Sequence, residues 1–181
     1  MTRIALCLLL PLALQGCGGD DETPAEPPVP PNLTLAGFGT VDGTNFDVDA
    51  DCIEIGTDAD QSLLVRLKGT GVTSIGDWSL RPPGTCGSNA ACGHLQVRVD
   101  PKKDGTYALQ ATGATTTLTL PFARPCPQTA SETECVGIDD PTGDHTIEVI
   151  LRDDDGVAVA EADGSPVRVT ADVTLALPGG C

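Results

Sequence analysis

The sequence predicts an all-β fold, an antiparallel β-sandwich, for the segment from Asn32 to Cys181. Short runs in which apolar and polar residues alternate are separated by Gly, Pro, Asn and Asp. A period of two residues puts one apolar face of each strand on a core, which is typical of antiparallel sheets. No stretch has the sustained 3.6-residue period of a helix. This length of about 150 residues suits one domain.

Four runs show the clearest alternation, and weaker ones are expected at residues 33–36, 51–55, 78–80, 107–111 and 117–122. About eight or nine short strands with frequent turns favour a sandwich, and a closed barrel is the alternative. The Asp155-Gly156 pair predicts a hairpin-type turn. The inward positions of the clear runs are Leu63, Val65 and Leu67; Leu95, Val97 and Val99; Ile147, Val149 and Leu151; and the odd-numbered positions from Val167 to Leu177.

The N-terminal end has the features of an export signal. Arg3 precedes an apolar run from Ile4 to Leu14, which is shorter than the roughly 20 residues that span a bilayer. The run ends in L-Q-G-C at residues 14–17, which resembles the lipobox of bacterial lipoproteins. This resemblance implies that residues 1–16 are a cleaved signal peptide and that the Cys17 thiol carries a lipid. Gly18 then favours the outer membrane, with the domain extracytoplasmic.

Residues 17–31 are expected to form a disordered tether, because they hold five prolines and four acids and almost nothing to bury. The whole chain has 26 acidic residues against 10 Lys and Arg, a formal charge of −16. This charge excludes nucleic acid as a partner and disfavours anionic lipid head groups. The expected partners are the membrane, through the lipid, and an unidentified envelope or surface protein. The oligomeric state is left open.

Six cysteines remain once Cys7 leaves with the signal and Cys17 is lipidated. An even number in an exported chain predicts disulfides, and the absence of a C-x-x-C pair disfavours zinc. The expected pairs are Cys86–Cys92 and Cys126–Cys135, each closing a loop rich in turn-forming residues, and then Cys52–Cys181, which ties the C-terminus to the body.

The C-terminal part of the chain is similar to the last strands of bacterial immunoglobulin-like modules. The similarity lies in the pattern G-D-H-T-I-E-V-I-L-R-D-D-D-G followed by P-V-R-V-T-A-D-V-T-L. It implies an immunoglobulin-like sandwich. It implies no activity, because a fold does not determine a function.

Both histidines are candidate transition-metal ligands. His94 and His145 each stand at the start of an expected strand. If the two strands are neighbours, the imidazoles and Asp144 would together bind a metal ion. The competing interpretation is that each is an exposed or hydrogen-bonded strand residue.

An aspartate-rich segment is the candidate calcium site. Asp42, Asp47, Asp49 and Asp51 resemble the opening of an EF-hand loop, but Cys52 stands where that loop needs glycine. The competing interpretation places the last three aspartates on the solvent face of a strand, with Phe46 and Val48 turned inward. Calcium held between loops would use these acids or further ones, namely Asp139, Asp140 and Asp144, or Asp153 to Asp155.

The sequence points to no enzyme and requires no cofactor, although calcium is possible. There is no G-x-S-x-G nucleophile motif, and the acids are too numerous to single out a catalytic pair. Five aromatic residues are few for stacking on glycans. The predicted function is therefore a structural or protein-interaction module of the cell envelope. The alternative is a metal-binding module, with calcium ahead of copper or zinc.

Overall fold

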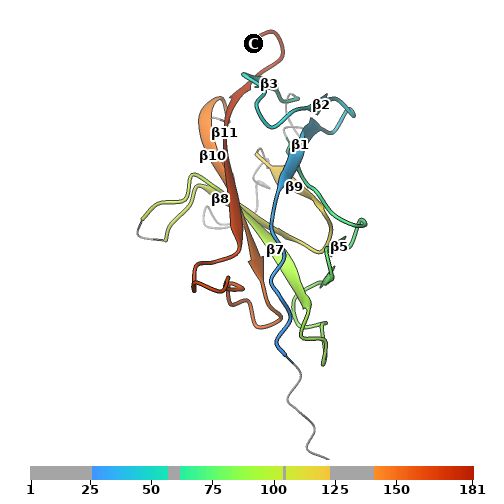
Figure 1. Cartoon of the computed structure of the whole chain (residues 1–181). Helices are drawn as coiled ribbons and strands as arrows, with labels where there is room; N and C mark the ends of the chain where they lie inside the picture. The colour runs from blue at the N-terminus through green and yellow to red at the C-terminus, as the bar shows by residue number, and fades with distance from the viewer. Residues whose placement is uncertain (1–25, 57–61, 104, 123–140) are drawn as a thin grey trace, which may run out of the picture.

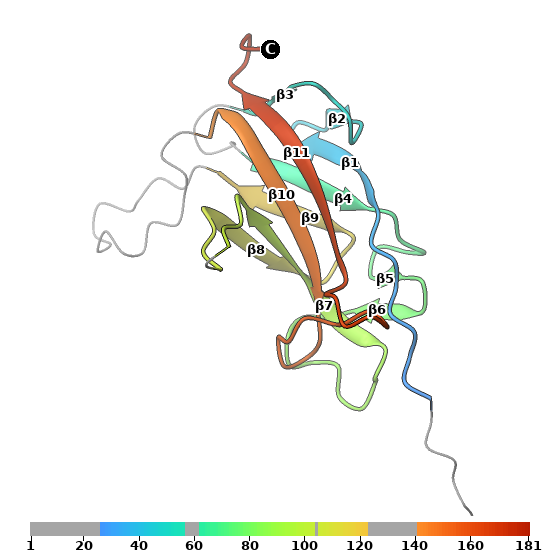
Figure 2. The ribbon, with the colours of Figure 1, turned by 60° about the vertical axis from the view of Figure 1, so that its left-hand side comes forward.

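The computed structural model describes residues 26–56, 62–103, 105–122 and 141–181. Within these ranges all regular structure is β, arranged in a four-stranded and a seven-stranded sheet. Figure 2 shows the two sheets as layers, with β10 and β11 on one side and β1, β4 and β9 on the other. The all-β, sandwich-like prediction is confirmed, whereas the immunoglobulin-like connectivity stays a prediction.

The smaller sheet has the strand order β2-β1-β4-β9 and is antiparallel throughout. In β4, Leu63, Val65 and Leu67 are buried, as their alternation predicts. A bulge lies between Leu35 and Gly37 of β1. Gly37 has a φ of 142°, and a Cβ there would lie 2.4 Å from the Phe46 carbonyl oxygen, so only glycine suits this position. The strands are β1 (Leu35–Thr40), β2 (Asn45–Phe46), β4 (Ser62–Leu67) and β9 (Thr117–Pro121).

The larger sheet has the order β3-β11-β10-β7-β6-β5, and β8 also pairs with β7. Its centre is the pairing of β10 with β7 on one side and β11 on the other. The predicted inward residues of β7 and β10 are all fully buried. The strands are β3 (Ile53–Glu54), β5 (Ser74–Ile75), β6 (Trp78–Leu80), β7 (Cys92–Val99), β8 (Leu109–Gly113), β10 (Gly143–Arg152) and β11 (Arg168–Ala176).

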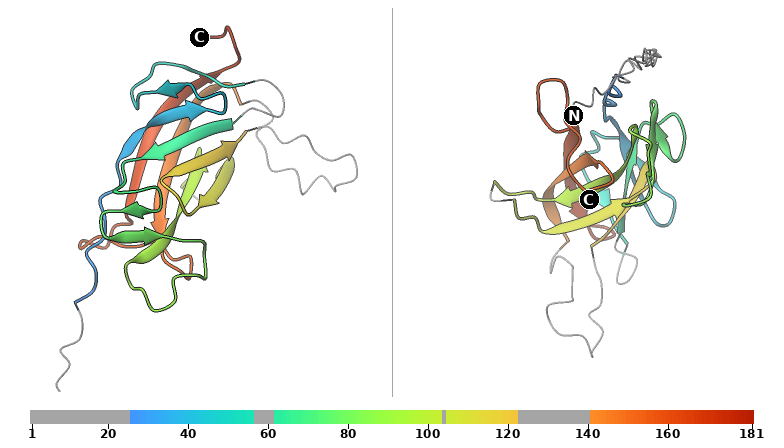
Figure 3. Two further views of the ribbon diagram at one scale, coloured as in Figure 1. Left: turned by 90° about the vertical axis from the view of Figure 1, so that its right-hand side faces the viewer. Right: turned by 90° about the horizontal axis from the view of Figure 1, so that it is seen from below.

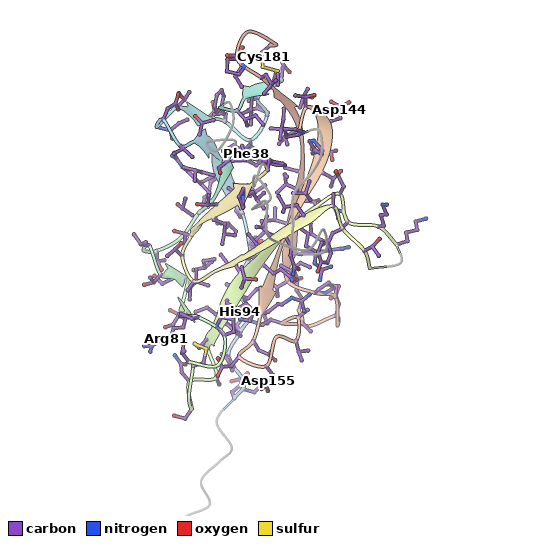
Figure 4. All side chains as sticks on the ribbon, turned by 180° about the vertical axis from the view of Figure 1, so that it is seen from behind. Phe38, Arg81, His94, Asp144, Asp155 and Cys181 are labelled. Carbon is purple, nitrogen blue, oxygen red and sulfur yellow. A yellow bond between two sulfur atoms is a disulfide. The ribbon has the colours of Figure 1, made fainter. Side chains whose placement is uncertain are left out.

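One hydrophobic cluster fills the space between the sheets and contains residues from both. Phe38 and Phe122 are its largest fully buried side chains. Figure 4 shows Phe38 reaching from its strand into the interior, and Figure 3 shows the two layers from the side of β4 and from below. Five aromatics suffice because most of the core consists of Leu, Ile and Val.

Two pairings are parallel, which corrects the antiparallel prediction at the sheet edges. The short strand β3 runs parallel to β11, and β6 runs parallel to the start of β7. Parallel neighbours need a long connection, and alternation within a strand cannot reveal its neighbour's direction. The strands β2 and β5 were not predicted, since two residues are too short to show a period.

The aspartate-rich segment after β2 is a loop, so its interpretation as a strand is wrong. Residues 47–52 have no strand structure, and Val48, expected to point inward, is exposed. The backbone turns here, because the Ala50 amide donates to the Asp47 carbonyl. By contrast, the predicted turn at Gly156 is present, with its amide donating to the Asp153 carbonyl.

Two disulfides lie within the described residues and are two of the three predicted pairs. Cys52–Cys181 joins residues 129 positions apart, and Cys86–Cys92 closes a loop of separation six. The first fastens the C-terminal end beside β3, where the Glu54 carboxylate also accepts from the Gly179 amide. The third predicted pair, Cys126–Cys135, lies outside the described residues, as does Cys17.

The domain-side end of the predicted tether lies against the domain. The Trp78 indole N–H donates to the Val29 carbonyl oxygen at 2.8 Å, and Pro28, Pro30 and Pro31 are half-buried. In Figure 1 this N-terminal segment leaves the body at the end opposite the C-terminus. No described helix has the length and hydrophobicity to cross a bilayer.

The Trp78 contact gives a first prediction. Trp78→Phe removes the indole donor and should lower the free energy of unfolding by about 0.5–1.5 kcal/mol. Urea denaturation under non-reducing conditions measures the change. Tyr107→Phe, a polar-group deletion at a more exposed aromatic, is the control and should change it by less than about 0.5 kcal/mol. Equal stability of Trp78→Phe and the wild type would contradict the contact.

Candidate functional site

The structure places four of the seven predicted metal ligands around one pocket. This acidic pocket has a volume of about 490 Å³, and two further acids, Asp100 and Asp172, complete it. It lies at the end of the domain that carries the C-terminus, where Figure 4 labels Asp144 and Cys181. The predicted residues that line it are Asp49, Asp51, Asp144 and His145.

Strand pairing explains how Asp172 joins the pocket. In the register of β10 with β11, Thr146 faces Asp172 and Asp144 faces Thr174. Each pair is linked by a hydroxyl that donates to a carboxylate, both at 2.7 Å. The sequence-based prediction did not include Asp172, because its place opposite Thr146 depends on the strand register. The sequence does show Asp172 as a polar residue in an alternating run.

The buried His145 and the half-buried Asp100 form one wall of the pocket. The His145 Nδ1 lies 2.8 Å from Asp100 Oδ2, and its Nε2 lies 3.2 Å from the Pro141 carbonyl oxygen. The other oxygen of Asp100 accepts from the Thr146 amide at 2.9 Å. Asp100 has a φ of 50°, in the left-handed region, so these bonds hold the chain in a conformation that aspartate tolerates better than most residues. The aspartate thereby ties the end of β7 to β10.

The carboxylates of the acidic pocket do not gather into a cluster of metal ligands within the described part of the chain. No three His, Cys, Asp or Glu side chains there converge on one point where an ion would sit. Asp100, Asp144 and Asp172 already accept from protein donors. The pocket is thus an acidic surface feature built partly from internally paired carboxylates.

The remaining predicted ligands lie elsewhere. Asp42 belongs to the turn between β1 and β2, where the Thr40 hydroxyl, followed by the Thr44 amide, lowers the pKa of its carboxyl. Asp47 is exposed in the loop after β2. Of the alternative calcium ligands, Asp153 accepts from the amides of its own turn. Asp139 and Asp140 lie outside the described residues.

The pairing of His94 with His145 in a metal site is wrong. Their strands are neighbours, as the hypothesis required, but they are antiparallel, and His94 pairs in register with Arg152 at the far end of β10. The starts of two antiparallel strands lie at opposite ends of the sheet. Figure 4 shows His94 far from Asp144, the neighbour of His145.

His94 is buried, with no partner for its Nδ1. Burial lowers the pKa of His94 below its ordinary value of 6.5, and the charge of Arg152 acts in the same direction against the opposing Asp153 and Asp154. His94 is therefore neutral in the fold over a pH range in which the unfolded chain is protonated.

This gives a second prediction. Because the unfolded chain binds the proton first, stability due to neutral His94 is complete above pH 6.5 and is lost as the pH falls through the lower folded-state pKa. Urea denaturation of wild type and His94→Leu between pH 7.5 and 5 tests this. The wild type should lose more stability than the variant, and parallel curves would contradict the assignment.

Comparison with known proteins shows a weak structural likeness. No protein-family model and no curated protein matches the chain. A similar solved structure is the extracellular domain of a protein provisionally assigned as a one-component system of B. thetaiotaomicron. The alignment has 13% identity and a TM-score of 0.34, and it covers 82% of this chain and 16% of the other. A TM-score this low supports no statement about the role of this chain.

Proposed function

We propose that the chain is the precursor of a lipid-anchored, extracytoplasmic module that serves a structural or protein-interaction role in the cell envelope and is not an enzyme. The observation that carries the proposal is the pair of disulfides, Cys52–Cys181 and Cys86–Cys92. Such bonds persist in oxidising compartments outside the cytoplasm. The signal-like N-terminus and the L-Q-G-C motif supply the export route and the anchor.

The tether joins the domain at the end away from the acidic pocket. Residues 26–31 leave the domain beside Trp78, whereas the acidic pocket lies at the opposite, C-terminal end. In a domain held by a lipid at Cys17, the acidic pocket would therefore lie at the end away from the point of attachment. Two or three acyl chains make such anchoring durable, at about 0.8 kcal/mol for each buried methylene.

The anchor gives a third prediction. Cys17→Ala removes the only thiol in the L-Q-G-C motif, so the protein produced in a bacterial host should move from the membrane fraction to the soluble extracytoplasmic fraction. It should also lose incorporation of labelled palmitate. Cys7→Ala, within the apolar signal core, is the matched control and should stay membrane-bound and labelled. A Cys17→Ala protein that remains fully membrane-bound would overturn the anchor.

A thermal melt separates this proposal from the calcium-binding alternative. The oxidised protein is treated with EDTA and then with calcium, zinc or copper, one ion at a time. Unchanged Tm values support the proposal. A rise of several degrees with calcium that Asp49→Asn or Asp144→Asn abolishes would instead make the acidic pocket a metal site, because a ligand that binds only the folded state stabilises it.

A further inference from the structure

The outward face of the larger sheet carries a cluster of arginines on an otherwise acidic protein. Alternation turns Leu95, Val97 and Val99 inward and leaves Gln96 and Arg98 outward. Across the sheet, Arg98 pairs in register with Glu148, and Gln96 with Ile150, which also faces Arg168. Three of the five arginines in the described ranges belong to this arginine face: Arg98, Arg152 and Arg168.

Two of these guanidinium groups meet at one neutral oxygen. The Gln96 Oε1 accepts from Arg98 Nε at 3.1 Å and from Arg152 Nε at 2.7 Å. The Gln96 amide nitrogen donates to Gln110 Oε1 at 2.7 Å, which fixes the amide with its oxygen toward the arginines. Arg152 donates once more, to the neutral Gly156 carbonyl. Two like charges therefore converge on an oxygen that carries no formal charge.

The nearby acids compensate this charge only in part. Glu148 is buried, and its oxygens lie 3.8 Å from Arg98 Nη1 and 3.1 Å from Arg168 Nη1. One carboxylate thus serves two guanidinium groups. Burial, followed by repulsion from Arg98, lowers the pKa of Arg152 despite the attraction of Glu148 and Asp153. Repulsion between Arg98 and Arg152 is therefore one of the two effects that disfavour the charged form of Arg152, after burial.

We propose that the arginine face binds an oxyanion, the carboxylate or phosphate group of a compact ligand, between Arg98 and Arg152, with Arg168 at the rim. A guanidinium group has five N–H donors in a planar fork that matches such groups. The bonds described above engage only the Nε and Nη1 atoms of Arg98 and Arg152. An anion placed there also relieves the repulsion between the two cations.

The same face limits the size and nature of the ligand. Tyr107, 38% exposed, lies with its ring 5.6 Å from the Arg98 guanidinium carbon and offers a flat apolar surface beside the anion. The chain as a whole carries a formal charge of −16, which opposes the approach of a long polyanion. A small ligand or a single terminal group with one or two charges fits both conditions.

The test uses the oxidised protein and two probes, inorganic phosphate and acetate, each at the ionic strength of a sodium chloride reference. We expect a rise of several degrees in Tm with at least one probe over chloride, together with movement of the Arg98 and Arg152 Nε–H signals in NMR spectra. If only phosphate or only acetate has these effects, that ion is the preferred oxyanion. No change with either probe, in either measurement, overturns the proposal.

Variants show whether the arginine face is the site. Arg98→Lys and Arg152→Lys keep the charge but lose the fork, so each should reduce the anion-dependent shift at least severalfold. Arg81→Lys, beyond the end of β6 and outside the arginine face, is the control and should respond like the wild type. Equal responses in all variants would overturn the site. This result would leave the lipid anchor unaffected, because that proposal is tested separately through Cys17.

Discussion

Replacing Cys52 and Cys181 together with alanine should lower the free energy of unfolding by about 5 kcal/mol if the bond acts through the entropy of the unfolded chain. The disulfide closes a separation of 129 residues, which includes nearly the whole domain. It also fastens the C-terminal end to the segment leading into β3, a strand of only two residues. Urea denaturation under non-reducing conditions measures the loss, with the slope checking that the unfolded state stays comparable.

The second described disulfide is the matched control. Cys86 and Cys92 close a separation of only six residues, so the paired alanine variant should lose about 2 kcal/mol in the same chain-entropy treatment. Loss of Cys52–Cys181, which closes the longer loop, should therefore lower the free energy of unfolding by more than loss of Cys86–Cys92, and the difference should be well outside experimental error. Equal losses from the two variants would show that native-state contacts, rather than loop length, determine what each bond contributes.

Phe38→Ala should lower the free energy of unfolding by about 3–5 kcal/mol, because it leaves a cavity in a close-packed core. Phe38 is 1% exposed and lies in β1, opposite Val65 of β4. Within the described residues, the core has three buried Phe or Trp side chains, Phe38, Phe122 and Trp78. Chemical denaturation measures the change.

An exposed apolar residue provides the comparison for Phe38. Val72 is 71% exposed, so Val72→Ala should change the free energy of unfolding by less than about 0.5 kcal/mol. Phe38→Leu keeps most of the apolar volume and should lie between the two. A Phe38→Ala protein as stable as Val72→Ala would mean that the inward direction of this side chain is wrong.

The fold class could be predicted because its signal is local. The alternation in β4, β7 and β10 is a property of a few consecutive residues, and each predicted inward residue there is buried. The pairing of Cys86 with Cys92 could be predicted for the same reason, since the two residues are close in sequence. Elimination then led to Cys52–Cys181, which the structure also contains.

The candidate site could be predicted only in part, because it depends on which strands are neighbours and in which direction they run. Asp144 and His145 were predicted together, and they share the acidic pocket with Asp49 and Asp51. The antiparallel direction of β7 and β10 then separates His94 from them and brings Asp100 beside His145 instead. No local pattern carries that information.

By itself, the sequence determined the period of the longer strands, the spacing of the cysteines and the overall acidity, because each of these is written in neighbouring residues or in composition. The tertiary structure decided the parallel edge pairings, the membership of the acidic pocket and the meeting of Arg98 with Arg152 at Gln96. These features follow from register and from pairing between strands that are distant in the chain. A one-residue change in the register of β7 would turn Gln96 and Arg98 to the other face of the sheet.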